Sequence, residues 1–248
     1  MIKVEVKLFL KDSGILKNDD ESQRAKILSE MSSIVLGKLL TITKPFAAFR
    51  KDNAWYLTGK SQKEAMERIV ITEGILSEDS HALVCRDLTR GFPMVTAKIW
   101  NSYDDTILCS NYIQSDLSNF SYRIVMNFDS EKEVLSSISR MLMDIISNIS
   151  PKIVRVETNN YSMSESHVFP DRLPVGWMFY TDTIYSEELS GFKGQINTVT
   201  RGNEPIGTLF LSKKGFFDGS NKEDIKAAND LEIMLVSHDI LPTYRNIF

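Results

Sequence analysis

The stretch Val175–Tyr180, between Pro174 and Asp182, is a short apolar and aromatic run with polar residues on both sides. Runs of this length, rich in aromatic and β-branched residues, are typical of a buried central strand. Gly176 lies inside the run, and a glycine within a strand indicates that another backbone or a bulky ring comes close. Apart from the phenol of Tyr180, no side chain here acts as an acid, base or metal ligand in the usual way. The most distinctive stretch of the chain therefore predicts core.

Alternating and short apolar runs predict further strands elsewhere in the chain. They fall at residues 2–10, 95–100, 106–112, 122–128, 153–158, 196–200 and 207–211. The runs at 95–100 and 106–112 are separated by five polar residues, which indicates a hairpin.

Apolar residues at helical spacing predict helices at about 21–40, 130–150 and 220–238. Ser130–Glu133 and Ser220–Glu223 have the spacing of a capping box at a helix start. A similar box at Ser61–Glu64 predicts a short helix that carries Ile69 and Val70 inward. Residues 77–94 are polar and are expected to be irregular.

The number of strands and hairpins predicts an α+β fold, with largely antiparallel sheet or sheets flanked by about four helices. We expect one domain, 1–248. The order of strands followed by a capped helix occurs at 95–148 and again at 152–238, so two similar lobes packed without a flexible linker are the alternative. Their boundary would lie near residue 150.

The composition excludes several classes of protein. The chain has 248 residues, a net charge of −4 and 25% charged residues, which is ordinary for a globular protein and shows no basic stripe for nucleic acid. It has neither a long apolar segment for a membrane span nor a signal-peptide pattern, so cytoplasmic location is the default. Cys85 and Cys109 are expected to be free.

We find no pattern that predicts catalysis. The three histidines are isolated, no Cys or His pair has metal-ligand spacing, and there is no glycine-rich phosphate loop or nucleophile elbow. We therefore expect no metal, no cofactor and no enzyme activity. A small enzyme with a cryptic site is the alternative.

Acidic residues are concentrated in two regions. Five acids occur at 101–131 against Arg123, and six occur at 157–188 against Arg172. Such regions suit a basic partner, because complementary charge speeds encounter and fixes register. A solvated surface that keeps the protein soluble is the plainer interpretation. Three tyrosines in polar loops, Tyr103, Tyr161 and Tyr185, have the character of interface anchors. An incidental loop position is the plainer interpretation of each one.

Several stretches, in their order along the chain, resemble the immunity protein 52 family. These stretches are Lys98–Asn101, Leu173–Met178, Gly207–Leu211, Phe217–Asp218, Asn221–Ala228 and Leu241–Pro242. The likeness extends from about Trp55 to Pro242. It departs at Ser102, where the family tends to have glycine.

This resemblance implies a bacterial immunity protein in the cytoplasm of a toxin producer. Such a protein binds and neutralises a cognate polymorphic toxin, often one delivered by type VI secretion, and here the usual partner has a restriction-endonuclease-like nuclease domain. A nuclease needs a basic groove for phosphates, which acidic loops could cover. The candidate toxin contacts are Tyr103, Asp104, Asp105, Asp116, Tyr161, Glu165, Asp182, Tyr185, Glu187 and Glu188.

Overall fold

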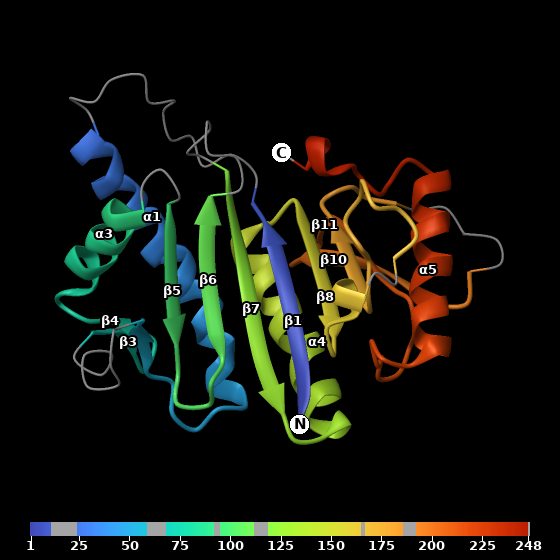
Figure 1. Cartoon of the computed structure of the whole chain (residues 1–248), viewed down its shortest axis with the longest axis horizontal. Helices are drawn as coiled ribbons and strands as arrows, with labels where there is room; N and C mark the ends of the chain where they lie inside the picture. The colour runs from blue at the N-terminus through green and yellow to red at the C-terminus, as the bar shows by residue number, and fades with distance from the viewer. Residues whose placement is uncertain are drawn as a thin grey trace. The chain divides into compact units, whose positions relative to one another are not determined.

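The computed structural model describes residues 1–10, 24–58, 68–91, 95–111, 119–164, 167–185 and 192–247 (Figure 1). The chain divides into two compact units. Unit 1 consists of residues 1–10 and 125–248, and unit 2 of residues 11–124. The division falls inside strand β7 (Phe120–Phe128), whereas the sequence analysis placed a lobe boundary near residue 150.

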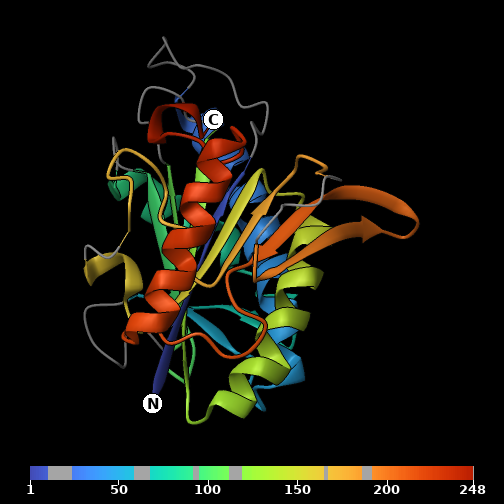
Figure 2. The ribbon, with the colours of Figure 1, turned by 90° about the vertical axis from the view of Figure 1, so that its right-hand side faces the viewer.

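Unit 1 contains an antiparallel set of strands in the order β10-β11-β9-β8-β1. Their bounds are β1 (Ile2–Phe9), β8 (Ile153–Thr158), β9 (Met178–Thr181), β10 (Gln195–Arg201) and β11 (Glu204–Leu211). Helices α4 (Glu131–Ile149) and α5 (Lys222–Ser237) lie on opposite faces of these strands (Figures 1 and 2). Every residue of β8 is buried, because this strand is covered on both faces. Unit 1 also contains the short 3₁₀ turns η3 (Tyr161–Ser164) and η4 (Tyr244–Asn246).

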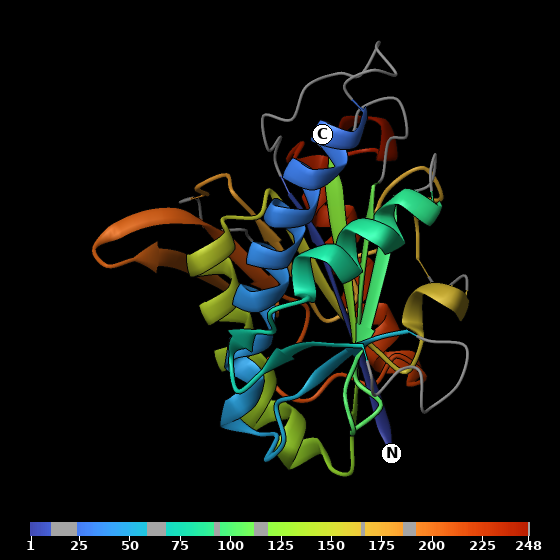
Figure 3. The ribbon, with the colours of Figure 1, turned by 90° about the vertical axis from the view of Figure 1, so that its left-hand side faces the viewer.

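Unit 2 contains a second antiparallel series of strands, in the order β6-β5-β2-β3-β4. Their bounds are β2 (Trp55–Leu57), β3 (Ile69–Thr72), β4 (Ile75–Leu76), β5 (Thr96–Trp100) and β6 (Thr106–Asn111). Helix α1 (Arg24–Thr43), which continues into the 3₁₀ turn η2 (Lys44–Ala48), contacts helix α3 (Ser80–Gly91), and α3 contacts β3 and β5 (Figure 3).

The expected fold class is confirmed. The described residues form four α-helices and antiparallel strands, which is an α+β arrangement. The hairpin expected at 95–112 is β5–β6. Among the described residues, no helix has the length and apolar character needed to cross a membrane.

The predicted helix cap is confirmed at α4, whereas at α5 the cap lies one residue further along the chain. At α4 the hydroxyl of Ser130 accepts a hydrogen bond from the amide of Glu133 at 3.3 Å, as expected, and the Glu133 carboxylate accepts one from the amide of Asp129. At α5 the cap is Asn221 rather than Ser220, and its side-chain oxygen accepts from the amides of Glu223 and Asp224. Asparagine and serine cap equally well, so the one-residue difference follows from which side chain reaches the free amides.

Two expectations were wrong. Ile69 and Val70, predicted on a short helix, belong to strand β3, where β-branched side chains pack well on a pleated surface. The capping box at Ser61–Glu64 lies outside the described residues. Residues 80–91, expected to be irregular, form α3, which buries Val84 and Leu88 at a spacing of one helical turn. The helical spacing of these two apolar residues was present in the sequence but was overlooked among their polar neighbours.

The stretch Val175–Tyr180 lies in the core, but only its second half, from Met178 onward, belongs to a strand. Trp177 is 1% exposed and its ring packs edge-on against Phe216. Gly176 has φ of +66°, bridges to Val156, and would place a Cβ 2.8 Å from the Val156 carbonyl oxygen. The close backbone approach expected at this glycine is therefore present, and β9 begins only after it, at Met178.

We expect Gly176→Ala to destabilise unit 1 more than Gly202→Ala does. Both glycines have a positive φ, which costs an alanine about 1–2 kcal/mol. A Cβ at Gly202 meets nothing within 4 Å, whereas a Cβ at Gly176 collides with a carbonyl oxygen, so the backbone must also shift. Urea denaturation of the two variants measures the difference, and equal losses of free energy of unfolding would contradict it.

Candidate partner-binding surfaces

The five-residue turn between β5 and β6 presents one of the predicted contact regions. The side-chain oxygen of Asn101 accepts hydrogen bonds from the amides of Tyr103 and Asp105, both at 3.0 Å. Asp104 has φ of +60°, a conformation that aspartate tolerates better than most residues. These contacts fix the turn and expose the Asp104 side chain at its tip.

Asp105 is not on the surface, although the sequence analysis proposed it as a contact. Its side chain is fully buried, and its two oxygens accept hydrogen bonds from Nε and Nη2 of Arg50, both at 2.8 Å. The side-chain NH₂ group of Asn101 donates to the same carboxylate at 3.0 Å. Asp105 therefore anchors the turn to the segment after η2, and we remove it from the set of candidate contacts.

Tyr103 is half-buried beside the same arginine. The Arg50 guanidinium lies 5.0 Å from the centre of the Tyr103 ring, and the Tyr103 hydroxyl accepts a hydrogen bond from the amide of Lys51 at 3.1 Å. The exposed Ser102 donates to Asp52 at 3.0 Å. We call Ser102, Tyr103 and Asp104 the turn surface.

The charge around the turn surface is mixed rather than acidic. Arg50, which stacks on Tyr103, also lines a hollow of about 420 Å³. It is lined by Lys44, Ala47, Arg50, Lys51, Asn53, Glu73 and Gly74. Three bases of this lining come from a stretch outside the acid-rich region 101–131, so counting charges along the sequence overestimated the local negative potential.

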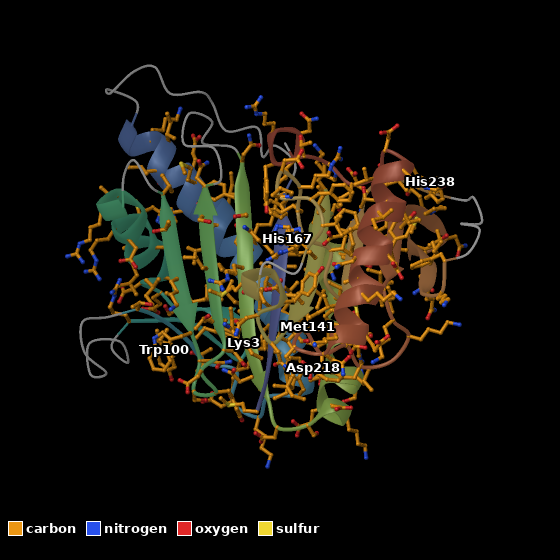
Figure 4. All side chains as sticks on the ribbon, turned by 45° about the vertical axis from the view of Figure 1, so that its right-hand side comes forward. Lys3, Trp100, Met141, His167, Asp218 and His238 are labelled. Atoms are coloured by element: carbon orange, nitrogen blue, oxygen red, sulfur yellow. The ribbon has the colours of Figure 1, made fainter. Side chains whose placement is uncertain are left out.

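The second contact region in the described residues follows β9 in unit 1. Asp182 is exposed, Ile184 is 54% exposed, and Tyr185 is half-buried. The amide of Tyr185 donates to the Thr208 hydroxyl at 2.8 Å, and its ring meets His238 edge-on with centroids 6.0 Å apart. Figure 4 marks His238 at the C-terminal end of α5. We call Asp182, Ile184 and Tyr185 the loop surface.

Tyr161, the remaining candidate that the structure describes, is buried. Its hydroxyl contacts Asn229 Oδ1 at 3.1 Å and Glu232 Oε1 at 3.2 Å, both on α5. Tyr161 therefore joins η3 to α5 and is removed from the candidate contacts. Asp116, Glu165, Glu187 and Glu188 lie outside the described residues.

Glu232 is the centre of a buried polar network that the sequence analysis missed. Its carboxylate is 1% exposed and accepts hydrogen bonds from Tyr161, from the amide of Val175 at 3.0 Å and from the amide of Val168 at 2.7 Å. Burial raises the pKa of this carboxyl, while the hydrogen bonds from Val168, Val175 and Tyr161 lower it, and the net direction is upward. A glutamate at an inward position of a helix is the sequence signal that could have found it.

A second buried cluster lies on β1 and β8. Glu5 and Glu157 occupy directly opposed positions, and Nη2 of Arg155 lies 3.5 Å and 3.4 Å from their respective carboxylates. Glu157 also accepts hydrogen bonds from the amide and the hydroxyl of Ser162 in η3. The guanidinium offsets the repulsion between opposed carboxylates, and the cluster attaches η3 to the sheet.

Neither cluster has the makeup of a metal centre. Among the described residues, no group of three or more His, Cys, Asp and Glu side chains is arranged to hold a metal ion. Cys109 is buried and Cys85 is half-buried, and both are free. Burial raises the pKa of the Cys109 thiol to about 12, which disfavours the nucleophilic thiolate.

Comparison with known proteins gives a likeness of fold. No family model and no curated protein match the sequence, so membership of the immunity protein 52 family is not confirmed. The structure is similar to a solved structure described as "Pseudomonas aeruginosa T6SS protein PA0821". The TM-score is 0.52 at 7% identity, and the match covers 95% of this chain and 76% of that chain. At this identity the two chains share a fold.

Asp105→Asn and Asp104→Asn are the same chemical change at adjacent positions. We expect the first to lower the free energy of unfolding strongly and the second to leave it almost unchanged. Asp105→Asn removes the negative charge from the buried ion pair with Arg50, and breaking a buried ion pair costs about 3–5 kcal/mol. Asp104→Asn changes an exposed side chain, which costs within about 0.5 kcal/mol. Urea denaturation measures both, and a small loss at position 105 would show that the ion pair does not anchor the turn.

Glu232→Gln should change how stability depends on pH. A carboxyl whose folded pKa is raised contributes stability below its unfolded pKa and loses it as pH rises through the folded pKa. The wild-type free energy of unfolding should therefore fall relative to that of Glu232→Gln as the pH rises from about 4, the ordinary value for a glutamate, toward neutral pH. Chemical denaturation of both proteins across this range measures the difference. A difference that stays constant or grows with pH would contradict the upward shift.

Proposed function

We propose that this chain is an immunity protein that binds a cognate bacterial toxin and neutralises it by stoichiometric protein–protein contact, without catalysis. The observation that carries the proposal is the shared fold with a protein of the type VI secretion system over 95% of the chain. The stretches that resemble the immunity protein 52 family support the same class of function. The proposed site of action is the cytoplasm of the toxin-producing cell.

The proposed contacts are the turn surface and the loop surface. Each presents an exposed aspartate within three residues of a partly exposed tyrosine, and aromatic anchors beside polar residues are enriched at protein interfaces. Each is also held by contacts inside its own unit, so little conformational entropy is lost on binding. A rigid loop that carries function on a packed scaffold is a common arrangement for recognition.

We propose a nuclease as the toxin. A nuclease needs a basic surface for phosphate groups, and Asp104 and Asp182 could each oppose a base of that surface. The mixed charge near the turn surface makes the loop surface the better candidate for such a contact.

The test uses the toxin encoded by the gene adjacent to that of this chain. We expect the two proteins to form a complex, and Asp182→Lys to slow association several-fold, because a charge at the rim of an interface acts mainly on the association rate. Stopped-flow association at low and high salt, together with survival of cells that express the toxin, measures the effect. Raising the salt concentration should reduce the difference from wild type.

Glu204→Lys is the matched control, because it makes the same charge reversal at an exposed position outside both surfaces. Its association rate should stay near that of wild type. If Asp182→Lys and Glu204→Lys slow association equally, the loop surface is not the contact. If no complex forms and the toxin stays active, the proposed function is wrong.

A further inference from the structure

Strand β10 is the last strand of the unit 1 series and pairs with β11 on one side. Within the described parts of the chain, no strand pairs with its other side. Figures 2 and 3 show the β10–β11 hairpin extending beyond the other elements of unit 1. Of the seven residues of β10, only Val199 is buried. The strand therefore has an open edge.

The backbone groups that face this edge can be identified from the register. The amide of Ser212 donates to the Trp177 carbonyl at 2.9 Å, on the β9 side of the chain, and successive residues of a strand point their backbone groups to alternate sides. Leu211 and Leu209 therefore face β10, where they pair with Gln195 and Asn197. It follows that the N–H and C=O groups of the intervening Ile196 and Thr198 point to the open edge.

As far as the structure describes the chain, the edge lacks the usual protection against pairing. Exposed edges are normally blocked by charged residues, proline, bulges or a covering element. The segment Gln195–Val199 carries no charge and no proline, and the register shift of the hairpin comes only between Val199 and Thr200. These five residues form a regular strand that is free to accept another.

We propose that β10 pairs antiparallel with β10 of a second copy of this chain, about a two-fold axis that lies midway between Asn197 of one copy and Asn197 of the other. Asn197 is the centre of the regular segment, so this register uses all of it. It places Ile196 opposite Thr198 of the other copy in two symmetric pairs, each of which exchanges both N–H···O bonds. A C₂ contact of this kind requires the same surface on both copies to be self-complementary.

The uncharged character of the strand favours a second copy over the toxin as the occupant. Like charges directly opposite each other destabilise a strand pair, and a self-paired strand brings identical residues close together. Gln195–Val199 offers no such repulsion, and it also offers no acid to attract a basic nuclease. The inference is independent of the proposed function, because it concerns neither the turn surface nor the loop surface.

Asn197→Cys tests the pairing directly. At the two-fold axis the two copies of residue 197 form a pair without backbone hydrogen bonds, with Cα atoms about 4.5 Å apart, which a disulfide can span. We expect oxidation to convert this variant to a covalent dimer of twice the 28.2 kDa chain mass. Gln195→Cys is the matched control, since the proposed register places residue 195 opposite Val199, too far from its own copy to form a disulfide. Oxidised wild type, with half-buried Cys85 and buried Cys109, controls for the native thiols.

Thr198→Pro tests the same contact without a crosslink. Proline removes an N–H that faces the open edge and leaves the bonds to β11, whereas Thr198→Ala changes the side chain and retains the N–H. We expect the mass of wild type and of Thr198→Ala to rise from monomer to dimer with concentration in sedimentation equilibrium, and Thr198→Pro to stay monomeric with unchanged circular dichroism. If Thr198→Pro fails to fold, the cysteine pair decides alone. A monomeric wild type, or equal crosslinking of the two cysteine variants, would overturn the proposal.

Discussion

The carboxylate of Glu232 attaches the segment between β8 and β9 to helix α5. It is almost fully buried on α5 and accepts hydrogen bonds from η3, through Tyr161, and from two amides of the segment that leads into β9. Segments without regular structure leave backbone amides that need partners once they are buried. One side chain provides partners for amides at Val168 and Val175, so α5, η3 and the entry to β9 depend on a single group.

In unit 2, too, a buried carboxylate fixes an irregular segment, in this case a single turn. The buried Asp105 carboxylate receives two bonds from Arg50 and one from Asn101, and the turn between β5 and β6 takes its shape from these contacts. In both units an acid that looks like a surface residue in the sequence is an internal support. Asp104, the residue before Asp105, is exposed and takes no part in this support.

The sequence predicted the regular elements far better than these supports. Periodicity found α4, the β5–β6 hairpin and the β10–β11 hairpin because each depends on residues close together in the chain. It failed at Ile69–Thr72, where a helix cap was followed by β-branched residues, and at α3, where the helical spacing of Val84 and Leu88 was overlooked among polar residues. Tertiary packing overrides such weak local preferences.

The candidate site was harder to predict because burial of a polar residue depends on a distant partner. Arg50, which buries Asp105, lies 55 residues before it, and Glu232 lies 71 residues after Tyr161. Neither distance leaves a trace in local composition. Within the acid-rich region 101–131, the exposed Asp104 and the internal Asp105 are adjacent in the chain. The neighbouring bases of η2 and of the segment after it lie outside that region, so a count along the chain did not include them.

This division between supports and exposed residues has a consequence for recognition. Among the described residues, the side chains of Asp104 and Asp182 accept no hydrogen bond, while those of Asp105 and Glu232 accept several. Substitution of an exposed acid therefore changes the surface at little cost in folding free energy, whereas substitution of a support releases a turn or a helix. Single substitutions at Asp104 or Asp182 can therefore change the surface of the protein while the loops that carry them stay in place.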